Sequence, residues 1–187
     1  MITARARLAE LFAKVDAFFA KVHARFPDED GVTCHAGCDD CCRRRFSVTA
    51  IEAEVIAEAL AALPEARREA LADRARGGDP GVCPALDEGG RCAVYEARPL
   101  ICRTHGLPIR FAAPPAGKRA LPVQSEPTID ACPKNFAGRD LAVLPADAVL
   151  DQTTLSTILG ALDAARAAEL GAPRGERVDI AAILAAR

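Results

Sequence analysis

Residues 34–42 read Cys34-His-Ala-Gly-Cys38-Asp-Asp-Cys41-Cys42, which places four cysteines within nine positions. Four more cysteines follow, at Cys83, Cys92, Cys102 and Cys132. Thiolates that loops and short turns bring together are the ligands of structural zinc ions and of iron–sulfur clusters. The pattern therefore predicts that all eight cysteines bind metal and that they organise the centre of the fold.

The adjacent pair Cys41 and Cys42 limits how the thiolates can be shared. Neighbouring side chains point about 100° apart on a helix and to opposite faces on a strand. The pair is therefore better suited to two different metals, or to different irons of one cluster, than to one small ion. If the run is helical, Cys34, Cys38 and Cys41 share a face and Cys42 lies at its edge, directed toward the second set. Eight thiolates could then complete two four-ligand sites, or one cluster plus another metal or a redox pair.

Two other roles for the cysteines fit less well. One or two scattered cysteines could be small buried apolar residues, but eight in these groupings are not explained in that way. A disulfide framework requires an oxidising compartment. The N-terminus, however, is interrupted by Glu10, Lys14, Asp16 and Lys21, unlike the unbroken apolar region of a secretory signal. We therefore predict a cytoplasmic protein with reduced thiols.

The segments on either side of the cysteines have helical patterns. Apolar residues recur at steps of three and four from Leu8 to Phe26, which predicts a helix over residues 3–26. Thr49 and Glu52 fit a capping box, which predicts a helix over residues 50–63. A second helix should run from Pro64 to Gly77, and the tail is predicted to be helical over residues 145–170 and 176–186.

The middle of the chain has shorter elements. Residues 83–95 surround the turn sequence Asp87-Glu-Gly-Gly90 and are predicted to form a small β-hairpin, followed by a helical turn at residues 98–102. A second hairpin could pair residues 107–111 with residues 119–123. The expected fold is α+β and mostly α-helical, with long helices flanking a small, irregular, cysteine-rich β-hairpin centre. We predict a single domain over residues 1–187, whose metal-binding core spans residues 32–136 between helices at 3–26 and 145–187.

Composition excludes several classes of partner. The 187 residues contain 24 basic and 26 acidic side chains, no tryptophan and one tyrosine. Such a balance is poorly suited to electrostatic capture of nucleic acid, and the few aromatic residues offer little base stacking. No apolar run approaches ~18 residues, so no membrane span is expected. Metal ions are the predicted partners, and the pattern predicts no particular protein partner.

Charged neighbours of the cysteines could support thiolate ligation. Guanidinium groups lower the pKa of nearby thiols and offset the negative charge of a four-thiolate site. His35 and His105 could replace a thiolate as ligand, although a hydrogen bond to a ligand or simple exposure is the more common role. The arginines beside the cysteines are Arg43, Arg44, Arg45, Arg91, Arg98 and Arg103.

The spacing resembles the YkgJ-type cysteine-cluster family, described as zinc- or iron-chelating. The resemblance covers about residues 34–135. It includes the 34–42 run, Cys83-x₈-Cys92 with its acidic-glycine turn, Tyr95 followed by Arg98-Pro99-x-x-Cys102-Arg103, and Cys132-Pro-Lys-Asn135. It implies metal binding through the cysteines. A similar cysteine region occurs in flagellin lysine N-methylases, held to be iron–sulfur proteins, which favours an iron–sulfur cluster, such as [4Fe–4S], over zinc.

Three functions remain open at this point. The first is an iron–sulfur protein with a redox role, such as an oxidoreductase. The second is a zinc-stabilised interaction module without catalysis, and the third is an iron–sulfur-dependent modifying enzyme. Candidate bases for an enzyme are Asp39, Asp40, Asp87 and His105, each of which could equally be a solvated surface group. The first three cysteines also fit radical-SAM spacing, but Asp40 replaces the usual aromatic residue, and no series of parallel strands is predicted.

Overall fold

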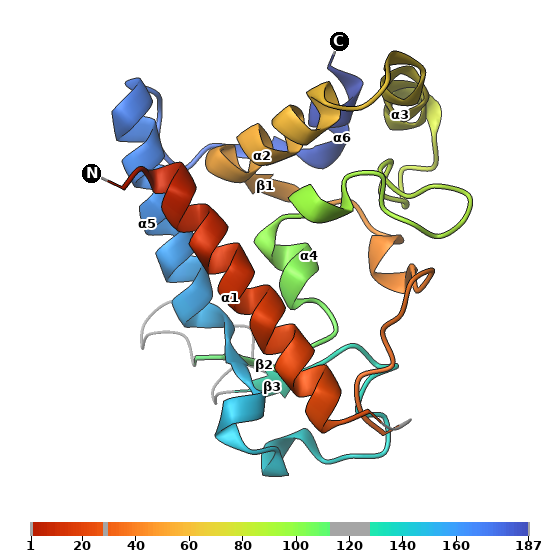
Figure 1. Cartoon of the computed structure of the whole chain (residues 1–187), viewed down its shortest axis with the longest axis vertical. Helices are drawn as coiled ribbons and strands as arrows, with labels where there is room; N and C mark the ends of the chain where they lie inside the picture. The colour runs from red at the N-terminus through yellow and green to blue at the C-terminus, as the bar shows by residue number, and fades with distance from the viewer. Residues whose placement is uncertain (1, 28–29, 113–127, 187) are drawn as a thin grey trace. The chain divides into compact units, whose positions relative to one another are not determined.

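The structure is a computed structural model that describes residues 2–27, 30–112 and 128–186. Within these ranges the chain forms six α-helices and small sheets of two or three strands (Figure 1), which confirms the predicted, mostly helical α+β fold. Its residues form two compact units, described separately below. The first unit comprises Met1–Leu8, His35–Cys102 and Gly160–Arg187; the second comprises Ala9–Cys34 and Arg103–Leu159.

The first unit is built on helices α2 (Ala50–Ala61), α3 (Glu65–Gly77) and α6 (Ile180–Ala185). Helix α6 packs against both α2 and α3 (Figure 1). Strand β1 (Ser47–Thr49) leads into α2 and pairs antiparallel with β5 (Arg177–Asp179), which leads into α6. Both helices are thereby anchored at their N-terminal ends by one small sheet. Their shared apolar core includes Val48, Ile56, Leu71, Ile180 and Leu184.

The helices of the first unit agree with the sequence except at the C-terminus. The helices predicted at 50–63 and 64–77 correspond to α2 and α3. The last helix, however, starts at Ile180 and not at residue 176, because residues 177–179 pair with β1. Asp179 then caps the helix, since its Oδ1 accepts a hydrogen bond from the Ala181 N–H at 2.7 Å.

The predicted hairpin at residues 83–95 is shorter than expected. It has one antiparallel bridge, between Leu86 and Cys92, with flanking hydrogen bonds from Asp87 N to Arg91 O and from Ala93 N to Ala85 O. The Asp87 carboxylate accepts the N–H groups of Gly89 and Arg91, so the segment closes as a tight Asx-type turn. Hydrogen bonds to the Asp87 side chain thus replace most of the backbone hydrogen bonds of the predicted hairpin. The segments before and after the turn are still brought together.

The second unit contains most of α1 (Ala4–Arg25), which matches the helix predicted over residues 3–26. Its sheet has the order β3-β2-β4, with β2 (Ile109–Phe111) antiparallel to β3 (Thr128–Asp130) and parallel to β4 (Leu150–Asp151). Helix α5 (Gln152–Leu170) follows β4 and ends in the first unit. The core of the second unit is formed by Val22, Val32, Leu107, Phe136 and Ala148.

In the second unit, the pairing of β2 and the start of α5 bear on two of the sequence predictions. The predicted partner strand at residues 119–123 lies outside the described residues; β2 pairs with residues 128–130. The helix predicted from residue 145 begins only at Gln152, because residues 146–148 form a 3₁₀ turn and residues 150–151 join the sheet. Asp151 then accepts the Thr154 N–H at 2.8 Å, as an N-cap does, and fixes the start of α5.

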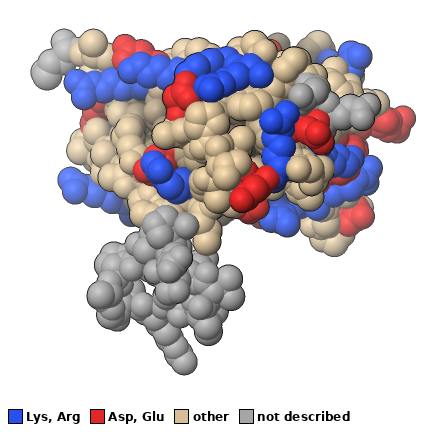
Figure 2. Space-filling view, turned by 90° about the horizontal axis from the view of Figure 1, so that it is seen from below, with Lys and Arg blue, Asp and Glu red and all other residues tan. Residues whose placement is uncertain are grey.

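Charge on the described surface is mixed. Figure 2 shows Lys and Arg side chains interspersed with Asp and Glu on the face in view. No helix among the described residues is both long enough and apolar enough to span a bilayer.

One exposed ion cluster in the second unit predicts a pH effect. Lys21 Nζ and Arg25 Nη1 lie 2.9 and 2.8 Å from the two carboxylate oxygens of Asp147. Hydrogen bonds from Lys21 and Arg25 hold the Asp147 pKa below its ordinary value of 3.8. A carboxyl whose pKa is depressed by folding contributes stability above its unfolded pKa and loses it as pH falls through the folded pKa.

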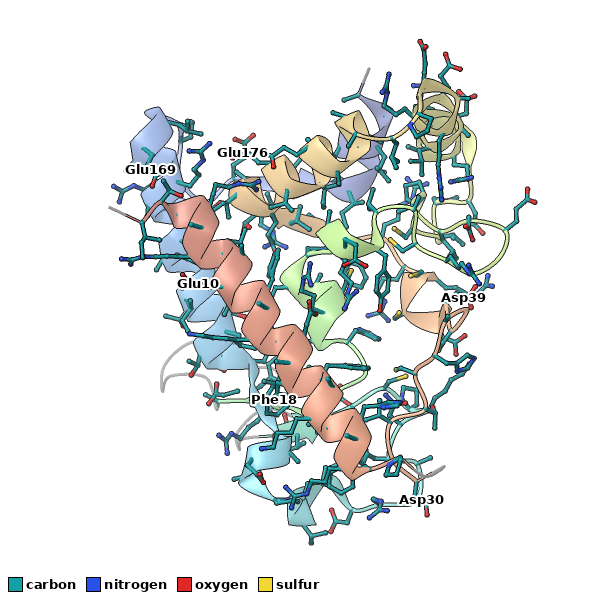
Figure 3. All side chains as sticks on the ribbon, in the orientation of Figure 1. Glu10, Phe18, Asp30, Asp39, Glu169 and Glu176 are labelled. Atoms are coloured by element: carbon teal, nitrogen blue, oxygen red, sulfur yellow. The ribbon has the colours of Figure 1, made fainter. Side chains whose placement is uncertain are left out.

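We therefore expect Asp147→Asn to lower the melting temperature slightly at neutral pH, because the cluster is exposed and screened by solvent. The difference from the unaltered protein should shrink as pH falls below the ordinary Asp pKa of 3.8. Thermal melts between neutral and strongly acidic pH measure it. Glu10→Gln, at an exposed position on α1 (Figure 3), is the control. A difference for Asp147→Asn that grows on acidification would contradict the prediction.

Candidate metal centre

The cysteine run at residues 34–42 is mostly loop. Only Asp40–Cys42 forms a 3₁₀ turn, closed by a hydrogen bond from Cys42 N to Asp39 O at 2.8 Å. Figure 3 labels Asp39, which precedes this turn; its carboxylate pairs with Arg43 at 2.8 Å. The helical arrangement considered for the run is therefore absent, since Gly37 with φ 94° interrupts any helix between Cys34 and Cys41.

The thiols of Cys41 and Cys42 lie within hydrogen-bonding reach of each other. A hydrogen bond from Cys42 is the largest influence on Cys41 and lowers its pKa from 9.0 to about 7. The same bond, with burial, raises the Cys42 pKa well above its ordinary value. The expected divergence of these adjacent side chains is thus wrong for this turn, and both thiols are available to one set of neighbours.

The turn is docked on the Cys83–Cys92 segment through the backbone. Cys83 N donates to Cys42 O at 2.7 Å. Gly90, with φ 72°, lies so close to Gly37 that a Cβ on Gly90 would be 2.9 Å from the Gly37 carbonyl oxygen. Arg45 reinforces the contact by donating to the carbonyls of Val82 and Asp79. Two glycines therefore permit the close approach that brings the Cys41–Cys42 turn to the second cysteine segment.

Cys83 and Cys92 lie against the apolar core of the first unit. Burial is the largest influence on both thiols and raises the pKa of each above 9.0. Arg45 partly opposes this rise at Cys83, and Arg98 does so at Cys92. Two of the six predicted arginines thus contribute positive charge at the thiols, as expected. Arg43 instead pairs with Asp39, and Arg103 pairs with Asp16 in the second unit.

Cys102 is carried by the short helix α4 (Leu100–Thr104), whose first turn is held by a buried carboxylate. Glu52 of α2 is 3% exposed. Its Oε1 accepts the Leu100 N–H at 2.8 Å, and its Oε2 accepts the Thr49 N–H and hydroxyl at 3.0 and 2.8 Å. Burial raises the Cys102 pKa to about 12, and the Glu52 carboxylate adds to the rise. The predicted capping box is confirmed, but its second role in holding α4 was not predicted from the sequence.

Five thiols of the first unit form one neighbourhood, which we call the five-thiol set. Each of them is influenced electrostatically by others in the set: Cys42 by Cys83 and Cys92, and Cys102 by Cys41, Cys83 and Cys92. Among the described residues no three His, Cys, Asp or Glu side chains are already arranged as a metal-ion site. The donors nevertheless fit a thiophilic metal in type, number and burial, with arginine charge nearby. The set consists of Cys41, Cys42, Cys83, Cys92 and Cys102.

The other three cysteines have different surroundings. Cys34 belongs to the second unit, where its Sγ accepts an N–H from Asn135 at 3.2 Å. Cys132 begins the turn that ends at Asn135, since Asn135 N donates to Cys132 O at 2.8 Å. Cys38 N donates to His35 O. All eight cysteines lie in the described ranges, are partly buried, and form no disulfide. The carboxylate of Asp87, one of the candidate bases, accepts the N–H groups of Gly89 and Arg91 within its own turn.

A family comparison agrees with this centre. Residues 33–116 match the CxxCxxCC family. The family is described as a "putative zinc- or iron-chelating domain", which confirms the resemblance seen in the sequence and supports metal binding by this segment. No curated protein and no solved structure matched the chain. The CxxCxxCC segment includes seven of the eight cysteines, while Cys132 follows it. In this chain three residues, not two, separate Cys34 from Cys38, and Gly37 is one of them.

Proposed function

We propose that the protein binds an iron–sulfur cluster in its cysteine centre, with ligands from the five-thiol set, and that it serves a redox role. The observation that carries the proposal is that the thiols of Cys41 and Cys42 lie side by side and both neighbour Cys83, with Cys92 near Cys42 and Cys102 near Cys41. A cluster core contains several irons, so two adjacent thiolates can bind separate irons while their neighbours complete the coordination.

The surroundings of the five-thiol set support this proposal. A [4Fe–4S] core with four thiolates carries a formal charge of about −2, which must be offset when the site is buried. Arg45 and Arg98 provide positive charge at Cys83 and Cys92. When bound, a cluster supplies one-electron transfer, and the chain's contribution is to hold the thiolates and limit access of water. Cys34, Cys38 and Cys132 remain proposed metal ligands, because eight thiolates exceed what one cluster requires and could serve more than one site.

A structural zinc site is the second candidate, because the family description names zinc as well as iron. Four thiolates of the five-thiol set would complete a tetrahedral zinc site. In that case the metal would tie the Cys41–Cys42 turn, the Cys83–Cys92 segment and α4 together without catalysis.

Anaerobic purification separates the two candidates. The full chain is analysed for iron, acid-labile sulfide and zinc, and its visible spectrum is recorded before and after dithionite. Iron with equivalent sulfide and a broad absorption that bleaches on reduction is the expected result. A colourless chain that contains zinc and no sulfide would overturn the iron–sulfur proposal and leave the zinc site.

Serine replacements test the five-thiol set itself. We expect Cys41→Ser and Cys42→Ser each to remove metal to a similar extent, with a loss of affinity of at least about tenfold, because both thiols belong to one set. Metal content and release to a chelator are the measurements. Ala93→Ser is the control, since it adds a hydroxyl beside Cys92, in the neighbouring cysteine segment, and leaves every thiol in place. If one replacement empties the centre and the other has no effect, the pair does not share a site.

A further inference from the structure

The side chain of Asn135 is buried beside Cys34 and makes four hydrogen bonds within the second unit. It is 3% exposed. Its Nδ2 donates to the Gly106 carbonyl at 2.6 Å and to Cys34 Sγ at 3.2 Å. Its Oδ1 accepts from the Thr33 N–H at 3.0 Å and from the Thr33 hydroxyl at 2.9 Å. The amide therefore uses both of its donors and both acceptor positions.

These partners fix which end of the amide faces the sulfur. The Thr33 N–H can only donate, so it requires the amide oxygen, and the Gly106 carbonyl can only accept, so it requires the amide nitrogen. A flipped amide would place two donors together at Thr33 and two acceptors together at Gly106. The N–H that points to Cys34 is thus determined by backbone atoms on two separate segments.

Gly106 permits the close approach of Cys34 and Asn135, because it has no side chain. It has φ 96°, and a Cβ there would lie 2.8 Å from Cys34 Sγ and 3.1 Å from Asn135 Nδ2. The absence of a side chain lets the sulfur approach the backbone, and the carbonyl then holds the second amide hydrogen. Three segments, at residues 33–34, 106 and 135, form one small cradle around a single sulfur atom.

We propose that Asn135 is a positioning residue that holds Cys34 as a hydrogen-bonded thiolate for metal ligation. This inference rests on the proposed function, in which Cys34 is one of the ligands. An N–H donated to a ligating sulfur stabilises the negative charge on that sulfur and fixes its direction. It also favours the reduced form of an iron–sulfur cluster, because reduction adds negative charge that the N–H stabilises. Asn135 follows the segment matched to the family, so the metal-binding region extends beyond residue 116.

Asn135→Asp tests the inference with little change in shape. The carboxylate keeps an oxygen for Thr33 and replaces the N–H that faces Cys34 with a second oxygen. We expect iron release to bathophenanthroline to quicken by roughly 10- to 100-fold, the range typical of lost hydrogen bonds to metal ligands. We also expect the midpoint potential to fall. If the wild-type metal is zinc, its release to a zinc-sensitive dye gives the first readout.

Gln152→Glu is the matched control, because Gln152 is another buried amide of the second unit, 9% exposed, whose Nε2 contacts Ser156. It introduces the same change from amide to acid at a residue with a different partner. Both variants are compared by far-UV circular dichroism and thermal melts. Thr33→Val is a milder second variant, since it removes one orienting hydroxyl and keeps the Thr33 backbone N–H; it should shift both readouts in the same direction by less.

A double-mutant cycle distinguishes positioning from general destabilisation. In a Cys34→Ser background, Asn135→Asp and Thr33→Val should no longer change release rate or potential, because the sulfur they act on is gone. Equal behaviour of Asn135→Asp and Gln152→Glu, or an undiminished effect in the Cys34→Ser background, would overturn the inference while leaving metal binding intact. A wild-type chain that binds neither iron nor zinc would overturn the proposed function, and the inference with it.

Discussion

Glu52→Ala should lower the free energy of unfolding by about 2–5 kcal/mol. Removal of the carboxylate leaves the Thr49 and Leu100 N–H groups buried without their acceptor, and each such loss costs about 1–3 kcal/mol. At this chain length the corresponding drop in melting temperature is roughly 5–15 °C. The variant should also release metal faster, because the same carboxylate holds the helix that carries Cys102.

Denaturant unfolding and chelator release measure the two effects. Glu58→Ala, on the same helix, is the matched control: Glu58 is exposed and pairs with Arg5 at the surface, where an ion pair contributes about 0–1 kcal/mol. Glu52→Gln should recover part of the loss, since an amide oxygen can still accept the Leu100 N–H. If Glu52→Ala and Glu58→Ala are equally stable, the carboxylate does not have the structural role assigned to it.

Gly90→Ala is expected to weaken the metal centre without touching a cysteine. The added Cβ meets the Gly37 carbonyl oxygen at 2.9 Å, and the positive φ of 72° costs roughly 1–2 kcal/mol for a residue with a side chain. The loop that carries Cys38, Cys41 and Cys42 must then move away from the Cys83–Cys92 segment. We expect metal release to quicken by about tenfold or more and stability to fall by about 1–3 kcal/mol.

Gly89→Ala provides a neighbouring control for this prediction. A Cβ at Gly89 meets only the Asp87 carboxylate, at 3.4 Å, which is ordinary van der Waals contact. Metal analysis and release rates of the two purified variants are compared side by side. Similar metal retention in both would show that the Gly37–Gly90 contact does not place the thiols.

The sequence was sufficient to predict α1, α2 and α3 and metal binding by the cysteine-rich segment. Apolar periodicity and the Thr49–Glu52 capping box are local patterns, so α1, α2 and α3 could be predicted nearly to their ends. The last helix could not, because whether residues 177–179 are helix or strand depends on their pairing with Ser47–Thr49, about 130 positions earlier. The pairing of residues 109–111 with 128–130 was missed for the same reason.

The grouping of the thiols was less accessible to sequence reasoning. The local run from Cys34 to Cys42 suggests a self-contained set, yet Cys41 and Cys42 neighbour Cys83, Cys92 and Cys102. Cys34 instead contacts Asn135, one hundred and one positions away in sequence. Gly37 and Gly90 offered a clue, since glycines beside cysteine segments permit close backbone approach, but their pairing could only be seen in three dimensions.

The shared carboxylate of Glu52 also bears on how the first unit opens. Because one side chain accepts the amides at the N-terminal ends of both α2 and α4, neither helix end can fray without also depriving the other of its acceptor. Two helices that are separated by some forty residues are thereby made into one cooperative opening unit. Hydrogen exchange at the Thr49 and Leu100 amides would then follow one common opening equilibrium. The short helix α4, which carries Cys102, would open as rarely as α2, the longer helix that packs in the core.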